Sequence, residues 1–61
     1  MTNEIKEKII STIEVTLKVQ VTKIGDGLLR FDIRGEQIHQ SYLQLEYYEK
    51  QGILQQYLLE L

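Results

Sequence analysis

The chain contains no cysteine, no proline and no tryptophan among its 61 residues. Without cysteine, neither a disulfide framework nor a thiolate metal site can form. No apolar run approaches the roughly 20 residues that a membrane-spanning helix needs, and no charged-then-apolar leader begins the chain. These absences favour a soluble protein, and we expect a cytoplasmic location without contact to a membrane.

A chain of 61 residues forms at most one domain, which we take as residues 1–61. Its apolar fraction of 43% and charged fraction of 26% are ordinary for a globular protein. A domain of about 60 residues buries only ~60% of its unfolded surface and is marginally stable alone. Because no disulfide or metal can add stability, we expect a homodimer or a bound partner.

The charge is small and unevenly distributed. The formal net charge is −2, with +1 over residues 1–34 and −3 over residues 35–61. A general nucleic-acid binder usually carries a basic domain, so this balance argues against that class.

The first segment has the periodicity of a helix. Ile5, Ile9 and Ile13 recur at every fourth position and form one apolar stripe. Thr2 or Asn3 can cap its N-terminus. Because the apolar period changes after this stripe, we expect the helix to end by Ile13.

Two alternating apolar runs follow, and they predict a β-hairpin. The first has valine or leucine at positions 15, 17, 19 and 21; the second has apolar residues at 29, 31 and 33. A two-residue turn would pair Val21 with Asp32, whereas a loop over residues 25–27 pairs Ile24 with Leu28 and keeps the carboxylate away from the valines. The longer loop is therefore favoured, with Gly27 in the left-handed conformation of a G1 bulge.

The remainder of the chain has helical character. No strong breaker interrupts residues 36–51, which predicts a long helix that ends before Gly52, and residues 54–60 predict a short final helix. The expected order is α-β-β-α-α. We therefore expect an α+β fold with two layers, in which the N-terminal helix and the long C-terminal helix cover an antiparallel β-hairpin.

The long helix has more apolar surface than one stripe. Leu43 and Tyr47 fall on nearly the opposite side from Tyr42 and Leu45, so either a partner covers them or another segment of the chain folds back over them. Exposed aromatic patches often mark interfaces. The expected partner-binding residues are four tyrosines and two nearby carboxylates: Tyr42, Tyr47, Tyr48, Tyr57, Glu46 and Glu49.

The polar face of the hairpin offers an alternative function. Lys18, Arg30 and Arg34 are residue types that contact phosphate, and a two-stranded ribbon can enter a major groove. An ordinary solvated sheet face also needs polar residues, and Asp32 lies in the middle of this one.

Nothing in the sequence indicates catalysis, a metal site or a cofactor. His39 is the only histidine, and a lone pair with Glu36 does not make a zinc site. Ser41 lies two residues from His39, so on the expected helix the two side chains point apart. We expect a protein that is not an enzyme.

The run Leu45–Leu54 resembles the end of the recognition helix in MerR-type regulators, which carries a similar tyrosine pair, glutamate and glycine. In that family a helix-turn-helix precedes this run, and Glu46 stands where an arginine is common. A β-hairpin is expected before it here, so we carry over no residue role. The expected function is a small protein-binding module that inhibits or adapts a protein partner by occlusion; the alternative is a nucleic-acid-binding regulator.

Overall fold

The computed structural model describes residues 3–61, so the possible cap Thr2 and the side chain of Asn3 lie outside the described part. The described residues form six elements, in the order α1 (Asn3–Leu17), β1 (Thr22–Ile24), β2 (Leu28–Ile33), β3 (Glu36–Ser41), α2 (Tyr42–Gln51) and α3 (Leu54–Leu59). The α+β class is confirmed, and a third strand joins the expected hairpin in an antiparallel sheet of order β1-β2-β3.

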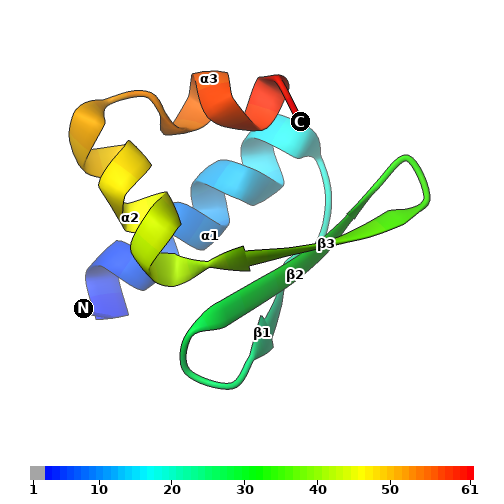
Figure 1. Ribbon diagram of the computed structural model, residues 1–61, viewed down its shortest axis with the longest axis horizontal. Coiled ribbons are helices and arrows are strands. Elements are labelled where there is room, and N and C mark those ends of the chain that lie inside the picture. Colours follow the sequence, from blue (N-terminus) through cyan, green and yellow to red (C-terminus); the bar gives the residue numbers. More distant parts are fainter. Residues whose placement is uncertain (1–2) are drawn as a thin grey trace.

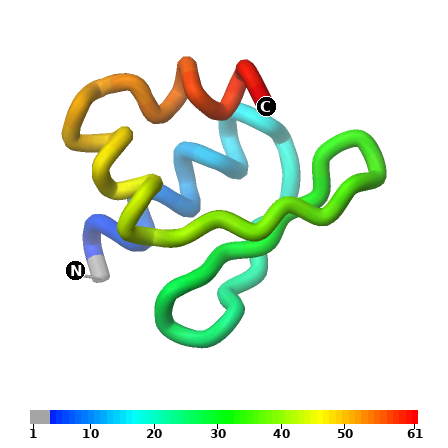
Figure 2. The backbone as a smooth tube through the Cα atoms, viewed as in Figure 1, coloured from blue at the N-terminus to red at the C-terminus, as the bar shows by residue number. Residues whose placement is uncertain are grey.

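The three helices gather beside the sheet, and the β2–β3 turn projects away from them (Figure 1). The end of the chain lies next to the C-terminal end of α1 (Figure 2), where Leu17 and Leu61 line a common hollow. The core joins all three helices to β2. Its buried members are Ile9, Ile10, Ile13, Leu29, Phe31, Tyr42, Leu45, Leu54 and Leu58.

The first helix is longer than predicted. It continues to Leu17 because the spacing Ile5, Ile9, Ile13 extends by one more turn, so that Leu17 also packs against the core. Val15, which the alternating pattern placed on the apolar face of a strand, is 74% exposed on this helix.

The first strand is correspondingly shorter than predicted. Only Thr22–Ile24 pairs with β2, while Val19 and Val21 are half-buried against the core in the connection from α1. The predicted register is correct where the strand exists, because Ile24 pairs with Leu28 and Thr22 pairs with Arg30. The same register would place Val21 opposite Phe31, but the strand pairing ends at Thr22.

The turn between β1 and β2 has its left-handed residue at Gly25, with a φ of 64°, and not at Gly27 as predicted. The loop still spans residues 25–27. The three-residue length fixes the register, and the register is the same whichever glycine supplies the left-handed residue.

The segment 36–41 is a strand and not the start of a helix. Arg34 and Gly35 both have positive φ, at 54° and 84°, which is the signature of a type I′ turn. This turn folds β3 back on β2, with Ile38 opposite Phe31 and His39 opposite Arg30. Tertiary pairing thus overrides the helical propensity of a glutamine-rich segment that has a single apolar residue, Ile38.

The second helix begins where the strand ends. Ser41 is its N-cap, and the Ser41 hydroxyl accepts a hydrogen bond from the Leu43 N–H at 3.2 Å. Gly52 ends the helix at a φ of 75°, as predicted. The short final helix is also confirmed, with Leu54 and Leu58 buried.

Candidate functional site

Three of the four tyrosines meet where α2 and α3 join. The rings of Tyr48 and Tyr57 have centroids 4.4 Å apart at an angle of 40°, and Tyr47 lies 5.9 Å from Tyr48 at 59°. Aromatic pairs at these separations attract one another beyond the area that they bury. We call Tyr47, Tyr48 and Tyr57 the tyrosine cluster.

The turn at Gly52 brings these rings together. The Gly52 N–H donates to the Glu49 carbonyl and the Ile53 N–H to the Tyr48 carbonyl, each at 3.0 Å. These bonds satisfy carbonyls at the end of α2 and turn the chain sharply, so α3 packs against both α1 and α2. The left-handed Gly52 therefore determines that Tyr57 reaches Tyr48.

An open hollow of about 390 Å³ lies beside the cluster, lined by Tyr48, Ile53, Gln56, Tyr57 and Glu60. Ile53 is 41% exposed here, so the hollow offers apolar as well as aromatic surface. Gln44 fixes one wall, because its amide nitrogen donates to the Tyr48 hydroxyl at 2.9 Å. We call this the tyrosine hollow; it can accept a side chain or short segment of another molecule.

Gln56 and Glu60 are site residues that were not predicted. Their sequence signal is helical spacing, since the N-cap Ile53, Gln56 and the C-cap Glu60 are three and four residues apart and so lie on one side of α3 and its caps. The short length of this helix hid that pattern.

Tyr42, expected at the interface, is a core residue with 2% of its surface exposed. It begins α2 on the side that carries Leu45, which is fully buried, and Lys6 lies over its ring with the ammonium 5.1 Å from the centroid. Burial raises the pKa of the Tyr42 phenol, and its hydroxyl has no hydrogen-bond partner within residues 3–61. The Tyr42 ring and hydroxyl therefore belong to the core and are not part of the exposed surface of the tyrosine cluster.

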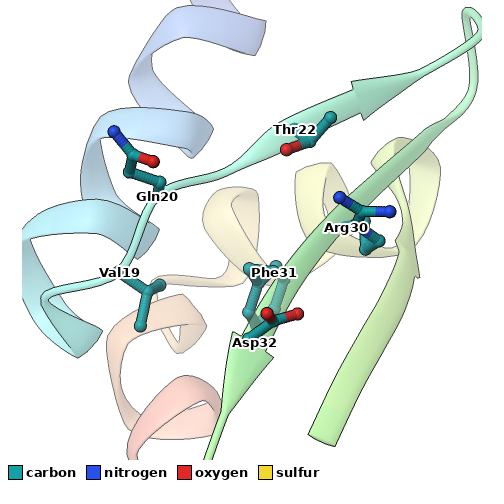
Figure 3. A pocket seen from close by; sticks show the side chains of 6 residues that line it. All are labelled: Val19, Gln20, Thr22, Arg30, Phe31 and Asp32. Carbon is teal, nitrogen blue, oxygen red and sulfur yellow. The ribbon is translucent and has the colours of Figure 1, made fainter. Parts of the chain in front are cut away.

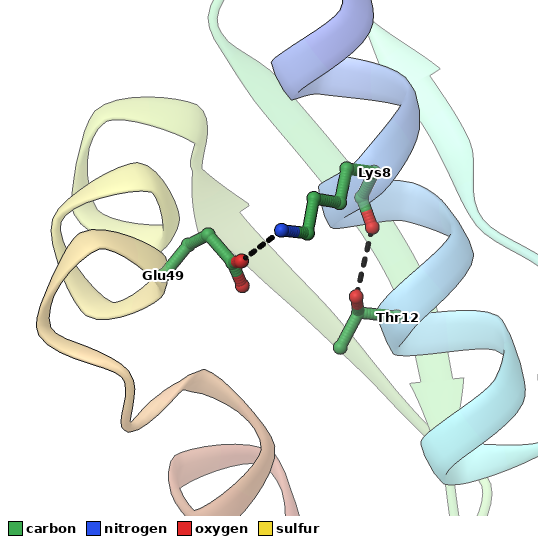
Figure 4. A network of polar contacts seen from close by, with 3 residues as sticks. All are labelled: Lys8, Thr12 and Glu49. Carbon is green, nitrogen blue, oxygen red and sulfur yellow. Dashed lines mark hydrogen bonds and ion pairs between the residues drawn. The ribbon is translucent and has the colours of Figure 1, made fainter.

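The two predicted carboxylates differ in their positions. Glu49 forms an ion pair with Lys8 of α1 at 3.0 Å, so it serves helix packing (Figure 4). Lys8 also presents its carbonyl to the Thr12 hydroxyl at 2.8 Å, which satisfies this polar side chain inside the helix. Glu46 is half-buried one residue before Tyr47.

The opposite side of α2 is exposed. Of the two alternatives that the sequence offered for this side, cover by another segment of the chain is therefore not seen. Leu43 is 73% exposed and Tyr47 is 59% exposed, so neither α1 nor α3 folds over this stripe. A single exposed apolar side chain is common on protein surfaces, but Tyr47 also belongs to the tyrosine cluster, so this exposed stripe adjoins that cluster.

The cations of the alternative function lie in three different segments. Lys18 follows the last residue of α1 with a φ of 56°, Arg30 lies in the middle of β2, and Arg34 lies in the β2–β3 turn. The predicted strand that would have aligned Lys18 with Arg30 is helical up to Leu17.

Arg30 lines an open hollow of about 380 Å³ beside β1. Figure 3 shows its wall built from the connection into β1, from β1 and from β2, which contributes both Arg30 and Asp32. A carboxylate in the same hollow weakens its attraction for phosphate.

Among residues 3–61, no group of three or more histidine, aspartate or glutamate side chains is placed to hold a metal ion. No helix in the same range is long and apolar enough to span a bilayer. No protein-family model, curated protein or solved structure matches this chain.

Proposed function

We propose that this chain is a non-enzymatic protein-binding module that acts by occluding a protein partner, and that the tyrosine hollow is its contact surface. The observation that carries the proposal is the juxtaposition of Tyr48 and Tyr57 with the exposed Ile53 around one open hollow, with Tyr47 against the Tyr48 ring beside it. Tyrosine supplies a large, rigid contact area with a polar end, which is why it is enriched at interfaces.

The chemistry of the hollow indicates the kind of segment that would bind. Its wall is aromatic and apolar, and Glu60 adds a carboxylate at the rim. An apolar anchor with a neighbouring lysine or arginine on the partner would satisfy both features, and the net charge of −3 over residues 35–61 would speed its approach. A cytoplasmic location and a homodimeric state belong to this proposal as expectations from the sequence.

The test compares two neighbouring glutamines on α3. Both Gln55 and Gln56 are exposed, but only Gln56 lines the tyrosine hollow. After a partner has been isolated with the wild-type chain, Gln56→Arg should weaken its binding at least about tenfold, the effect of a hot-spot contact, and Gln55→Arg should leave it unchanged.

Calorimetry on the purified pair, with circular dichroism of each variant alongside, measures the effect. Equal affinities for the wild-type chain and the Gln56→Arg variant would exclude the hollow as the contact surface. A parallel loss for both variants would point to a general charge effect.

A further inference from the structure

The outer edge of β3 is a regular strand edge of six residues, Glu36–Ser41. The sheet order β1-β2-β3 gives β3 one neighbour, so its other side can accept a further strand. Within residues 3–61, no backbone hydrogen bond outside the sheet joins Gln37, His39 or Gln40 to another segment.

The hydrogen-bonding phase shows which groups point outward. The Tyr42 N–H donates to the Gly27 carbonyl at 3.0 Å, which continues the β2–β3 ladder by one pair. Bonded and non-bonded pairs alternate in an antiparallel ladder. Gln40 and Ile38 therefore bond to β2, while Gln37, His39 and Ser41 direct their backbone groups away from it.

We propose that a second copy of this chain pairs with β3 edge to edge, antiparallel, about a two-fold axis at His39. The outward groups are symmetric about this residue. His39 would exchange two hydrogen bonds with His39 of the second copy, and Gln37 would lie opposite Ser41. About four backbone hydrogen bonds result, because the Ser41 carbonyl is already used at the start of α2.

Charge complementarity favours a second copy over an unrelated peptide. Glu36 of the second copy would lie opposite Tyr42, on the face of the sheet that carries the core. Lys6 holds its ammonium over the Tyr42 ring at 5.1 Å, so a carboxylate would meet a cation at each end of the interface. Residues 37–41 between these ends contain no acidic residue, lysine or arginine, so no like charges of those types oppose each other.

The need for association supports the same occupant. The chain is 61 residues long without cysteine, a size at which one core gives marginal stability. Pairing two copies would extend the sheet from three strands to six and remove the longer of its two free edges. This inference deepens the homodimeric part of the proposed function and does not depend on the tyrosine hollow.

Single cysteines test the register directly, since the chain has none of its own. In the proposed dimer, residue 39 of each copy lies about 5.5 Å from its equivalent between Cα atoms, within disulfide range. Residue 37 lies about 14 Å from its equivalent, because the two are four residues apart along the strands as well as one strand apart, and this is too far. His39→Cys and Gln37→Cys are thus matched variants, on one strand and one face, and both residues are exposed.

Under mild oxidation at low concentration, His39→Cys should become a covalent dimer at least about tenfold faster than Gln37→Cys, as the geometric limit on disulfides requires. Equal rates would mean random collision and would overturn the proposal, as would no cross-linking by either variant. Sedimentation of the wild-type chain gives the second readout: a concentration-dependent dimer is expected, and a monomer throughout contradicts it.

Proline variants keep the proposal testable without cysteine. His39→Pro removes an outward N–H and no bond to β2, so the monomer should stay folded by circular dichroism while the dimer is lost. A persistent His39→Pro dimer would overturn the proposed edge.

The ion pairs at the ends of the interface give a separate test. Glu36→Lys should weaken dimerisation about tenfold, and adding Lys6→Glu should restore it. If Lys6→Glu does not restore dimerisation, Glu36 does not lie beside Lys6 of the second copy, and the proposed register is wrong. None of these changes touches the tyrosine hollow, and Gln56→Arg should leave dimerisation unchanged, so the two proposals can fail separately.

Discussion

The two edges of the sheet are built in opposite ways. β1 has three residues, and polar contacts tie the strand and the residue before it to α1: Lys23 pairs with Glu7 at 3.3 Å, and the Glu14 carboxylate accepts from the Val21 N–H at 3.3 Å. β3 has six residues and a bare outer edge. Short length and a charged side chain are common means of protecting an edge against unwanted pairing. Only the β1 edge of this sheet is therefore protected, and the β3 edge is available for a specific partner.

The central strand β2 pairs with both edge strands, so removing its buried side chain should have the largest effect on stability. Phe31 is 1% exposed and packs with the buried residues of the three helices. Phe31→Ala should cost about 3–5 kcal/mol, which at this chain length removes most or all of the stability. Urea unfolding followed by circular dichroism measures the loss.

The adjacent Asp32→Ala is the control for Phe31→Ala, because Asp32 is exposed on the same strand and should change stability by less than about 0.5 kcal/mol. Similar losses for both variants would mean that β2 contributes through its backbone and not through the Phe31 side chain.

A smaller, stabilising effect is expected at the junction of β3 and α2. The Tyr42 hydroxyl is buried without a hydrogen-bond partner in residues 3–61. Because a buried unsatisfied hydroxyl is costly, Tyr42→Phe should stabilise the chain by about 1 kcal/mol. Thermal unfolding at neutral pH measures the gain, and a loss would reveal that the hydroxyl is satisfied in solution.

The same residue gives a pH dependence with a definite sign. Burial raises the pKa of Tyr42 above its ordinary value, so folding favours the neutral phenol. Its contribution is complete below the ordinary tyrosine pKa of about 10 and is lost as the pH rises through the folded-state value. The wild-type chain should therefore lose more stability than Tyr42→Phe in alkaline urea titrations. Parallel curves would contradict this.

The comparison of the edges also shows what the sequence could predict. The β1–β2 register was predictable, because a one-residue slip would bury Asp32 among apolar residues. The helix through residues 14–17 and the strand over residues 36–41 were predicted wrongly. The first segment was expected to be a strand, and the second was expected to be a helix. In the first, β-branched residues suggest a strand, but Leu17 lies four residues after Ile13 and the helix can bury both. In the second, the helical propensity of glutamine is outweighed by the type I′ turn at Arg34-Gly35.

Local signals for the missed strand and site were nevertheless present. Arg34-Gly35 is a two-residue turn between runs of matching length, and Ser41-Tyr42-Leu43-Gln44 has the spacing of a capping box. The residues of the tyrosine cluster were all among the expected partner-binding residues, but the sequence did not distinguish them from Tyr42, which is buried. Tyr42 begins α2 on its buried side, and that face is determined by where the helix starts.

The smallest expected effect concerns the defended edge itself. The Lys23–Glu7 pair is largely exposed, with 56% and 67% of the side chains in contact with solvent. A double-mutant cycle with Lys23→Ala and Glu7→Ala should therefore give a coupling of less than about 0.5 kcal/mol, which added salt reduces further.

The Lys23–Glu7 pair should matter more for specificity of association than for stability, because removing the Lys23 charge leaves an uncharged edge at β1. If Lys23→Ala forms species larger than a dimer while the wild-type chain does not, the pair protects that edge; if its association state is unchanged, the short length of β1 is protection enough.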